Sequence, residues 1–358
     1  MIGSVEAHFA ALRAAVEACF PVQEVWFQDG RPVFTIVPGP DDKARFLRLR
    51  DRLAELGMLP LLRRHAGETV IILVPKPPES RTSWRLPAAL FAATLVTTFL
   101  AGYLNARGAC VPGLPSPVVG GISFSLSLMA ILFCHEMGHK TVSVLRRIDS
   151  SLPFFIPMPP VPGLAIGTLG AVIVTRTPSP NRDALVELGA SGPIAGFLVA
   201  IPILIYGIRH SVVIAHSAIA ASGCEVVSVP TPLLVNLLVQ WLLRPPPSAD
   251  VIIHPMAFAG WVGLLVTALN LLPASMLDGG HVMRAVFGAR AHRILSYVAV
   301  GVGLLFGYWV MSLLILLMIR RGHPGPLDDI SPVSPARLAM AASLVAIFVL
   351  SAVPLMTL

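Results

Sequence analysis

The residues with the clearest chemical signature are His135, Glu136 and His139, which form an HExxH motif within the segment 133–139. On a helix, positions i and i+4 lie on the same face, so both imidazoles can bind one zinc ion. The carboxylate between them is then close enough to act on a water held by that ion. The motif therefore predicts metal-assisted hydrolysis, provided that this segment is helical.

A catalytic zinc usually takes three protein ligands and keeps one position for water. The extended motif HExxHxxGxxH is excluded, because Val142 and Leu145 stand where it requires Gly and His. Glu187 and Glu225 follow later in the chain, but neither has the polar neighbours expected of a ligand. Asp278 differs from the other late aspartates because it stands at the end of an apolar run. It is the predicted third ligand.

The composition indicates a membrane protein. Only 13% of the 358 residues are charged and 55% are hydrophobic, whereas soluble proteins carry about a quarter charged residues. The net charge of +7 does not indicate nucleic-acid binding, because the basic residues lie beside acids or at the ends of apolar runs. Ionisable groups inside a bilayer are costly and are functional by default, so an HExxH motif within an apolar run is informative.

The elements that must position these residues are membrane helices. About 20 apolar residues span a bilayer, and this length predicts helices at 87–106, 117–145, 188–208, 253–277, 294–319 and 338–357. The proline-rich segment 152–177 predicts a β hairpin at the membrane face, and 226–243 predicts an interfacial or re-entrant piece. Asp278 returns to the depth of the histidines if neither of these two segments spans the membrane or if both do, and we expect that neither does. The predicted fold is a polytopic α-helical membrane protein with about six transmembrane helices.

The N-terminal 80 residues predict a small soluble α+β domain. Two strand-like runs flank Asp29-Gly30, a strong hairpin signal, and an amphipathic helix and a β-branched strand follow. We expect domains at 1–80 and 81–358. The positive-inside rule orients the N-terminal domain to the cytoplasm, and we expect a multi-pass protein of a prokaryotic plasma membrane.

Together these motifs resemble the site-2 protease family of intramembrane zinc metalloproteases. Its two defining motifs are HExxH within a span and the NxxPxxxxDG pattern, which here runs from Asn270 to Gly279. The chain is most similar to the archaeal, cyanobacterial and plastid branch, and the similarity is carried by the segments 151–157, 167–171, 181–185, 192–196 and 323–337. One departure is Ser275-Met276, where that branch often has Gly-Gln.

The resemblance implies one catalytic Zn²⁺ bound by His135, His139 and Asp278, with Glu136 as general base and acid. Asn270 is implied to orient the substrate or to stabilise the oxyanion. The implied activity is cleavage of transmembrane or membrane-anchored proteins near the cytoplasmic face, as in regulated intramembrane proteolysis. The implied partners are such substrates, the lipid bilayer and a possible partner of the N-terminal domain, but no nucleic acid.

Several alternatives stay open. The chain can also be a zinc-binding transporter, or a catalytically silent relative that binds substrates. The predicted hairpin can hold an unwound substrate as an edge strand or serve only as a lid. His281 lies one helical turn after Asp278 and is an alternative ligand. Cys110 and Cys224 can form a disulfide, and the GxxxG spacing of 192–196 favours helix packing.

Overall fold

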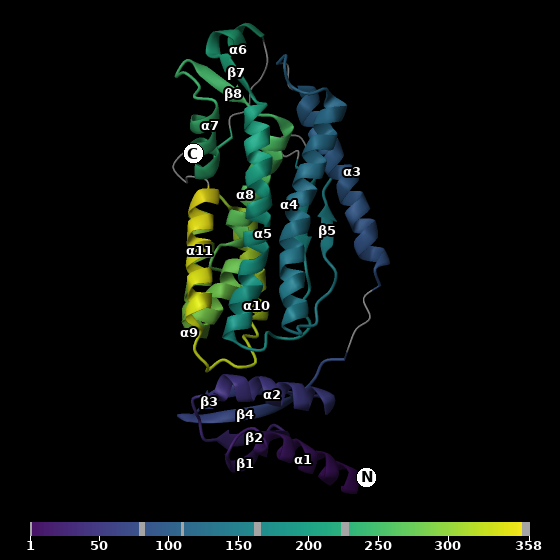
Figure 1. Ribbon diagram of the computed structural model, residues 1–358, viewed down its shortest axis with the longest axis vertical. Coiled ribbons are helices and arrows are strands. Elements are labelled where there is room, and N and C mark those ends of the chain that lie inside the picture. The colour runs from purple at the N-terminus through teal and green to yellow at the C-terminus, as the bar shows by residue number, and fades with distance from the viewer. Residues whose placement is uncertain (1, 79–82, 109–110, 161–165, 223–228, 353–358) are drawn as a thin grey trace.

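The computed structural model describes residues 2–78, 83–108, 111–160, 166–222 and 229–352. Long helices stand side by side along the long axis of the molecule, and an N-terminal unit lies across one end of them (Figure 1). The opposite end carries a short helix and a small hairpin. The chain is mostly helical, as its apolar runs predict.

The N-terminal unit, residues 2–75, is a four-stranded antiparallel sheet with two helices. Its elements are α1 (Ile2–Glu17), β1 (Val22–Gln28), β2 (Arg31–Ile36), α2 (Asp42–Glu55), β3 (Met58–His65) and β4 (Glu68–Pro75). The strand order is β1-β2-β4-β3. The predicted hairpin turns at Asp29 and Gly30, both with positive φ. Strand β3 was not predicted, because Pro60 and the basic residues at its end obscure the alternation of apolar and polar residues. The strand lies at an edge of the sheet, where proline is tolerated.

The helices beyond the linker are α3 (Arg85–Gly108), α4 (Pro117–Leu145), α5 (Arg182–Arg209), α7 (Leu233–Leu242), α8 (Pro255–Asn270), α9 (Asp278–Leu305), α10 (Trp309–Arg321) and α11 (Pro335–Ser351). Within the described residues, α3, α4 and α5 are long and apolar enough to cross a membrane. Helices α7, α8 and α11 are apolar but shorter. The expected count of about six spans is therefore not confirmed.

Two predicted helices are broken or cut short in the structure. The run 294–319 is not one helix, because α9 ends at Leu305 and Gly307 adopts a φ of 80°. The amide of Tyr308 then donates to the carbonyl of Gly303 over 2.7 Å, which closes a Schellman turn. The run 253–277 is also shorter than predicted, because α8 stops at Asn270 and an irregular turn leads into α9.

The predicted hairpin forms from β5 (Phe154–Pro157) and β6 (Thr168–Val172), which pair antiparallel. It lies beside α3 and α4 along their length and not at their ends (Figure 1). The hydroxyl of Thr97, in the middle of α3, donates to the carbonyl of Gly167 over 2.6 Å. A second hairpin, β7 (Val212–Ala215) with β8 (Ala249–Ile252), and α6 (His216–Ser222) were not predicted.

Helices α4 and α5 form the centre of the bundle, and glycines set their spacing. A Cβ on Gly138 of α4 would lie only 2.4 Å from the Ser191 carbonyl oxygen of α5. Near the other end of α5, a Cβ on Gly207 would lie 2.2 Å from the backbone nitrogen of Ala257 in α8. These contacts bring three helix backbones close together and hold the face of α4 that carries the HExxH motif against its neighbours.

Candidate metal centre

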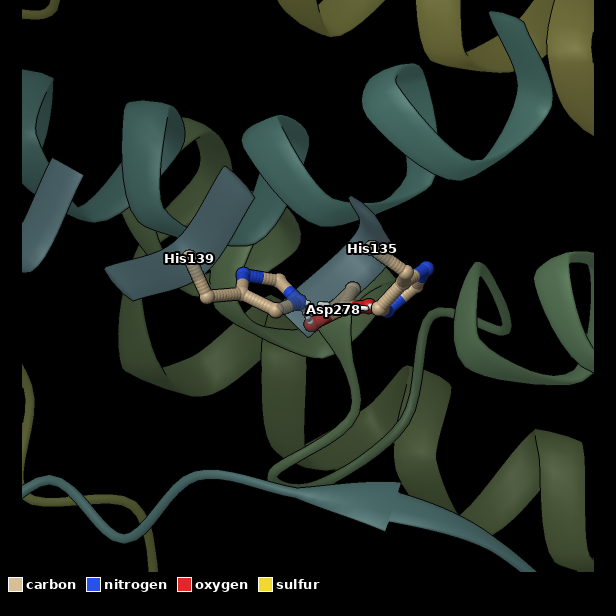
Figure 2. A group of neighbouring side chains, drawn as sticks. All are labelled: His135, His139 and Asp278. Carbon is tan, nitrogen blue, oxygen red and sulfur yellow. Dashed lines mark hydrogen bonds and ion pairs between the residues drawn. The ribbon is translucent and has the colours of Figure 1, made fainter. Parts of the chain in front are cut away.

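The structure brings His135, His139 and Asp278 together, and their side chains point toward one another (Figure 2). The two Nε2 atoms are 3.2 Å apart. Each lies 3.3 Å from one carboxylate oxygen of Asp278. Tetrahedral ligands about 2.1 Å from zinc are separated by about 3.4 Å. Each of these three spacings is close to that value, with each histidine facing a different oxygen of the carboxylate.

The hydrogen bond of His139 fixes which of its ring nitrogens carries the proton, and this tautomer suits metal binding. Its Nδ1 lies 2.7 Å from the carbonyl oxygen of Leu188 in α5. Because a carbonyl only accepts, Nδ1 carries the proton and Nε2 is left free for a metal. Metal-binding histidines are usually oriented through such a bond from the other ring nitrogen.

The space for these imidazoles comes from glycines on α5. A Cβ on Gly192 would lie 2.1 Å from Nε2 of His139, and a Cβ on Gly196 would lie 3.3 Å from Nδ1 of His135. The GxxxG spacing therefore packs helices, as the sequence predicts, and it also makes the cradle for both imidazoles. The sequence analysis missed this second role, because spacing alone does not show which side chain faces a glycine.

Asp278 reaches the histidines through the turn between α8 and α9. This turn is tight: a Cβ on Gly279 would lie 2.1 Å from the carbonyl oxygen of Leu271, and Ser275 has a φ of 47°. The turn makes Asp278 the first residue of α9. Asn270, the last residue of α8, places its amide nitrogen 3.5 Å from Nε2 of His135.

The centre is enclosed. His135 and Glu136 are 4% and 5% exposed, and the side chain of Asp278 is 13% exposed. Glu136 lies within electrostatic range of both histidines and Asp278. Two imidazoles and one carboxylate are a common donor set for a catalytic zinc, with one position left for water. The residues present therefore fit the metal, and a carboxylate beside it can accept a proton from that water.

Comparison with known proteins supports the same chemistry. A family model described as Peptidase family M50 matches residues 123–314, which include the HExxH motif and Asp278. The chain belongs to this family. The match confirms the resemblance to site-2 proteases, and M50 membership implies a metalloprotease with a zinc cofactor.

The relatives are plant proteins. The chain is 30% identical over 250 residues to the probable zinc metalloprotease EGY1, chloroplastic, of Oryza sativa subsp. japonica, covering 66% of this chain and 41% of that protein. It is 28% identical over 249 residues to EGY1 of Arabidopsis thaliana, covering 66% and 43%. It is 26% identical over 226 residues to EGY2 of Oryza sativa subsp. indica, covering 58% and 38%. The chain thus spans about two fifths of these relatives, and no solved structure matches it.

The predicted setting in a prokaryotic plasma membrane is contradicted. The EGY relatives are named as chloroplastic, not as proteins of a prokaryotic plasma membrane. The error has a physical cause: span length and hydropathy are the same in any bilayer of similar thickness, so composition does not distinguish one membrane from another.

Other predicted residues have different roles. His281 is outside the donor group that the described residues form; its Nδ1 lies 2.8 Å from Nε2 of His323. Glu187, excluded as a ligand, forms ion pairs with Arg146 and Arg337. The proposed disulfide between Cys110 and Cys224 lies outside the described residues.

Proposed function

We propose that this M50 protein is an intramembrane endopeptidase that cleaves substrates with a transmembrane segment, near the end of the helices that faces the N-terminal unit. The observation that carries the proposal is the convergence of two histidines in the apolar helix α4 with Asp278, the first residue of α9. In this proposal residues 81–358 form the metalloprotease domain, and residues 1–80 form a separate domain that binds a partner.

The depth of the site supports cleavage near that end. Along α4, His135 lies about 15 Å from Leu145 and about 27 Å from Pro117, at 1.5 Å per residue. The end at Leu145 faces the N-terminal unit, because Arg50 donates to the carbonyl of Arg146 over 3.3 Å. Water therefore has the shorter path to the site from the side of the N-terminal unit.

The ligands in the proposal are His135, His139 and Asp278. Bound zinc would lower the pKa of a coordinated water toward about 7 and polarise the scissile carbonyl. Glu136 takes the proton of the attacking water and passes it to the leaving nitrogen. Asn270 donates its amide hydrogen to the substrate carbonyl, where negative charge develops.

A helical substrate hides its amides in its own hydrogen bonds, so it must unwind before cleavage. In this proposal the unwound part of the substrate binds along β6. This strand pairs with β5 on one side and has no other partner strand among the described residues. An added substrate strand would gain backbone hydrogen bonds. Leu169, with 67% of its surface exposed, is available to contact a substrate side chain.

The test compares Glu136→Gln with wild type in liposomes, using a panel of single-span substrates labelled on the side of the N-terminal unit. Glu136→Gln should keep wild-type zinc content but lose cleavage by about 10²–10⁴-fold, the usual contribution of a general base. Asp278→Asn should lose zinc as well. Glu24→Gln, at an exposed strand position, is the matched control. Undiminished cleavage by Glu136→Gln contradicts the mechanism.

The chloroplastic names of the relatives support a plastid membrane as the setting. The proposed substrate class is proteins with a transmembrane segment. The same substrate panel tests this class: cleavage of spanning substrates but not of the same sequences in soluble form is the expected result.

A further inference from the structure

An irregular segment between α10 and α11, residues 323–331, lies between the N-terminal unit and the metal-binding helices. We call it the tail strap. Its centre is buried although it has no regular secondary structure; Leu327 is 2% exposed and Asp328 is fully buried. A buried irregular segment must find partners for its polar groups. These partners show what the strap connects.

On one side the strap is bound to the N-terminal unit. The guanidinium of Arg63, on β3, donates to the carbonyls of Pro326 and Leu327 over 2.9 and 2.7 Å. The backbone amide of Leu62 also donates to the carbonyl of Leu327 over 2.9 Å. The side chain of Leu327 packs into the hydrophobic core of the N-terminal unit. The strap therefore continues the edge of that sheet.

On the other side the strap is bound to the first turns of α9. Asp329 accepts two hydrogen bonds from Arg284, over 2.9 and 2.6 Å. The approach is close, because a Cβ on Gly325 would lie 2.5 Å from the Arg284 guanidinium. His323 adds a second link through its bond to His281.

The bond between His281 and His323 has a defined direction. The amide of Gly325 donates to Nδ1 of His323 over 2.9 Å, so the proton of a neutral His323 lies on Nε2. That proton is donated to Nδ1 of His281. The contact is thus a complete hydrogen bond between two neutral rings, and it does not require a metal between them.

Asp278, His281 and Arg284 follow one another at intervals of three on α9, so they share one face of the helix. Asp278 is the first residue of that helix and has no helical turn before it. Its position relative to His135 and His139 therefore depends on what holds the first turns of α9 in place.

We propose that the tail strap is a positioning element for Asp278, and that it couples the seating of the N-terminal unit to the geometry of the metal centre. Arg63 and Asp329 are the two positioning residues of this link. This inference rests on the proposed function and its ligand set. It adds a positioning role for residues that contact neither the metal nor the substrate.

The experiment measures zinc dissociation constants of the full chain in lipid nanodiscs by competition with a chelator. Partners that orient metal ligands typically contribute about 10–100-fold to affinity. Asp329→Asn should therefore weaken zinc binding about tenfold or more, and Arg63→Gln at least about threefold. The neighbouring Arg64, which is exposed, provides the matched control Arg64→Gln, and Asp250→Asn, at the other end of the molecule, controls for Asp329→Asn. Both controls should bind zinc as wild type does.

A spectroscopic readout separates positioning from general destabilisation. The visible absorption bands of the Co²⁺-loaded protein report coordination geometry, and they should change in Asp329→Asn and Arg63→Gln but not in the controls. Asp329→Glu, which keeps the charge, should restore most of the affinity. If Asp329→Asn does not fold, Arg63→Gln decides alone.

Asp278→Asn, measured in parallel, separates the two proposals. If it keeps wild-type zinc affinity, the ligand set is wrong. If it loses zinc while Arg63→Gln and Asp329→Asn keep wild-type affinity and spectra, the ligand set stands and the strap proposal is overturned.

Discussion

Gly192→Ala is the sharpest test of how α5 supports the metal centre. The added Cβ would lie 2.1 Å from Nε2 of His139, whereas ordinary contacts begin near 3.4 Å. The imidazole must therefore move by about 1.3 Å, or the helices must separate. Metal–ligand distances tolerate only about 0.2 Å of error, so the substitution should remove His139 from the ligand set.

The expected loss of zinc affinity follows from the free energy that one ligand contributes. Structural zinc sites bind with about 10–16 kcal/mol, or about 3 kcal/mol for each of four ligands. Losing one ligand should weaken binding by about 100-fold, at 1.4 kcal/mol per factor of ten. Cleavage should fall at least in proportion, because in the proposed site the same nitrogen holds the metal beside Glu136.

The assay is chelator competition with the same protein in nanodiscs, and two other glycines provide graded controls. A Cβ on Gly196 would lie 3.2 Å from Cβ of His135, which needs a shift of only a few tenths of an ångström. A Cβ on Gly301 would have nothing within 4 Å. The expected order of zinc loss is Gly192→Ala, then Gly196→Ala, then Gly301→Ala with none. Wild-type affinity in Gly192→Ala would refute the placement of His139 against α5.

Two further predictions concern metal removal and the ion pairs at the ends of the helices. Chelator treatment should abolish cleavage, and added zinc should restore it, whereas magnesium should not, because it prefers oxygen ligands. Glu187→Gln should destabilise the fold by about 1–3 kcal/mol, because it removes the charge that pairs with Arg146 and Arg337 while both arginines keep about a third of their side-chain surface in solvent. Arg147→Ala, which breaks an exposed pair with Asp51, should cost at most about 1 kcal/mol; denaturant titration measures both.

The predictable parts of the fold are those whose structure follows from a short stretch of sequence alone. The HExxH motif needs only helical periodicity, and the hairpin at Asp29-Gly30 needs only its turn residues. The apolar runs locate α3, α4 and α5 because a spanning helix has a fixed length. The third ligand could be proposed because a carboxylate at the end of an apolar run is costly without a role. The structure brings it to the histidines.

The rest depends on contacts between distant segments. The break between α9 and α10 rests on the single residue Gly307, which an apolar run does not reveal as a stop. The second role of Gly192 depends on which side chain of α4 faces it. The pair Arg284–Asp329 joins residues 45 apart in sequence, and the tail strap has no periodicity that would mark it as buried.

Charged residues are scarce in this chain, and those at the helix ends near the N-terminal unit form ion pairs or hydrogen bonds. Charged groups at a helix end are stable if water or an opposite charge reaches them. Here Lys43 of the N-terminal unit forms an ion pair with Asp183 of α5 and also donates to the carbonyl of Pro332. Arg63 and the tail strap complete the same contact surface. The N-terminal unit therefore supplies charged and hydrogen-bonding partners to groups at these helix ends, and the helices, the strap and this unit stabilise one another.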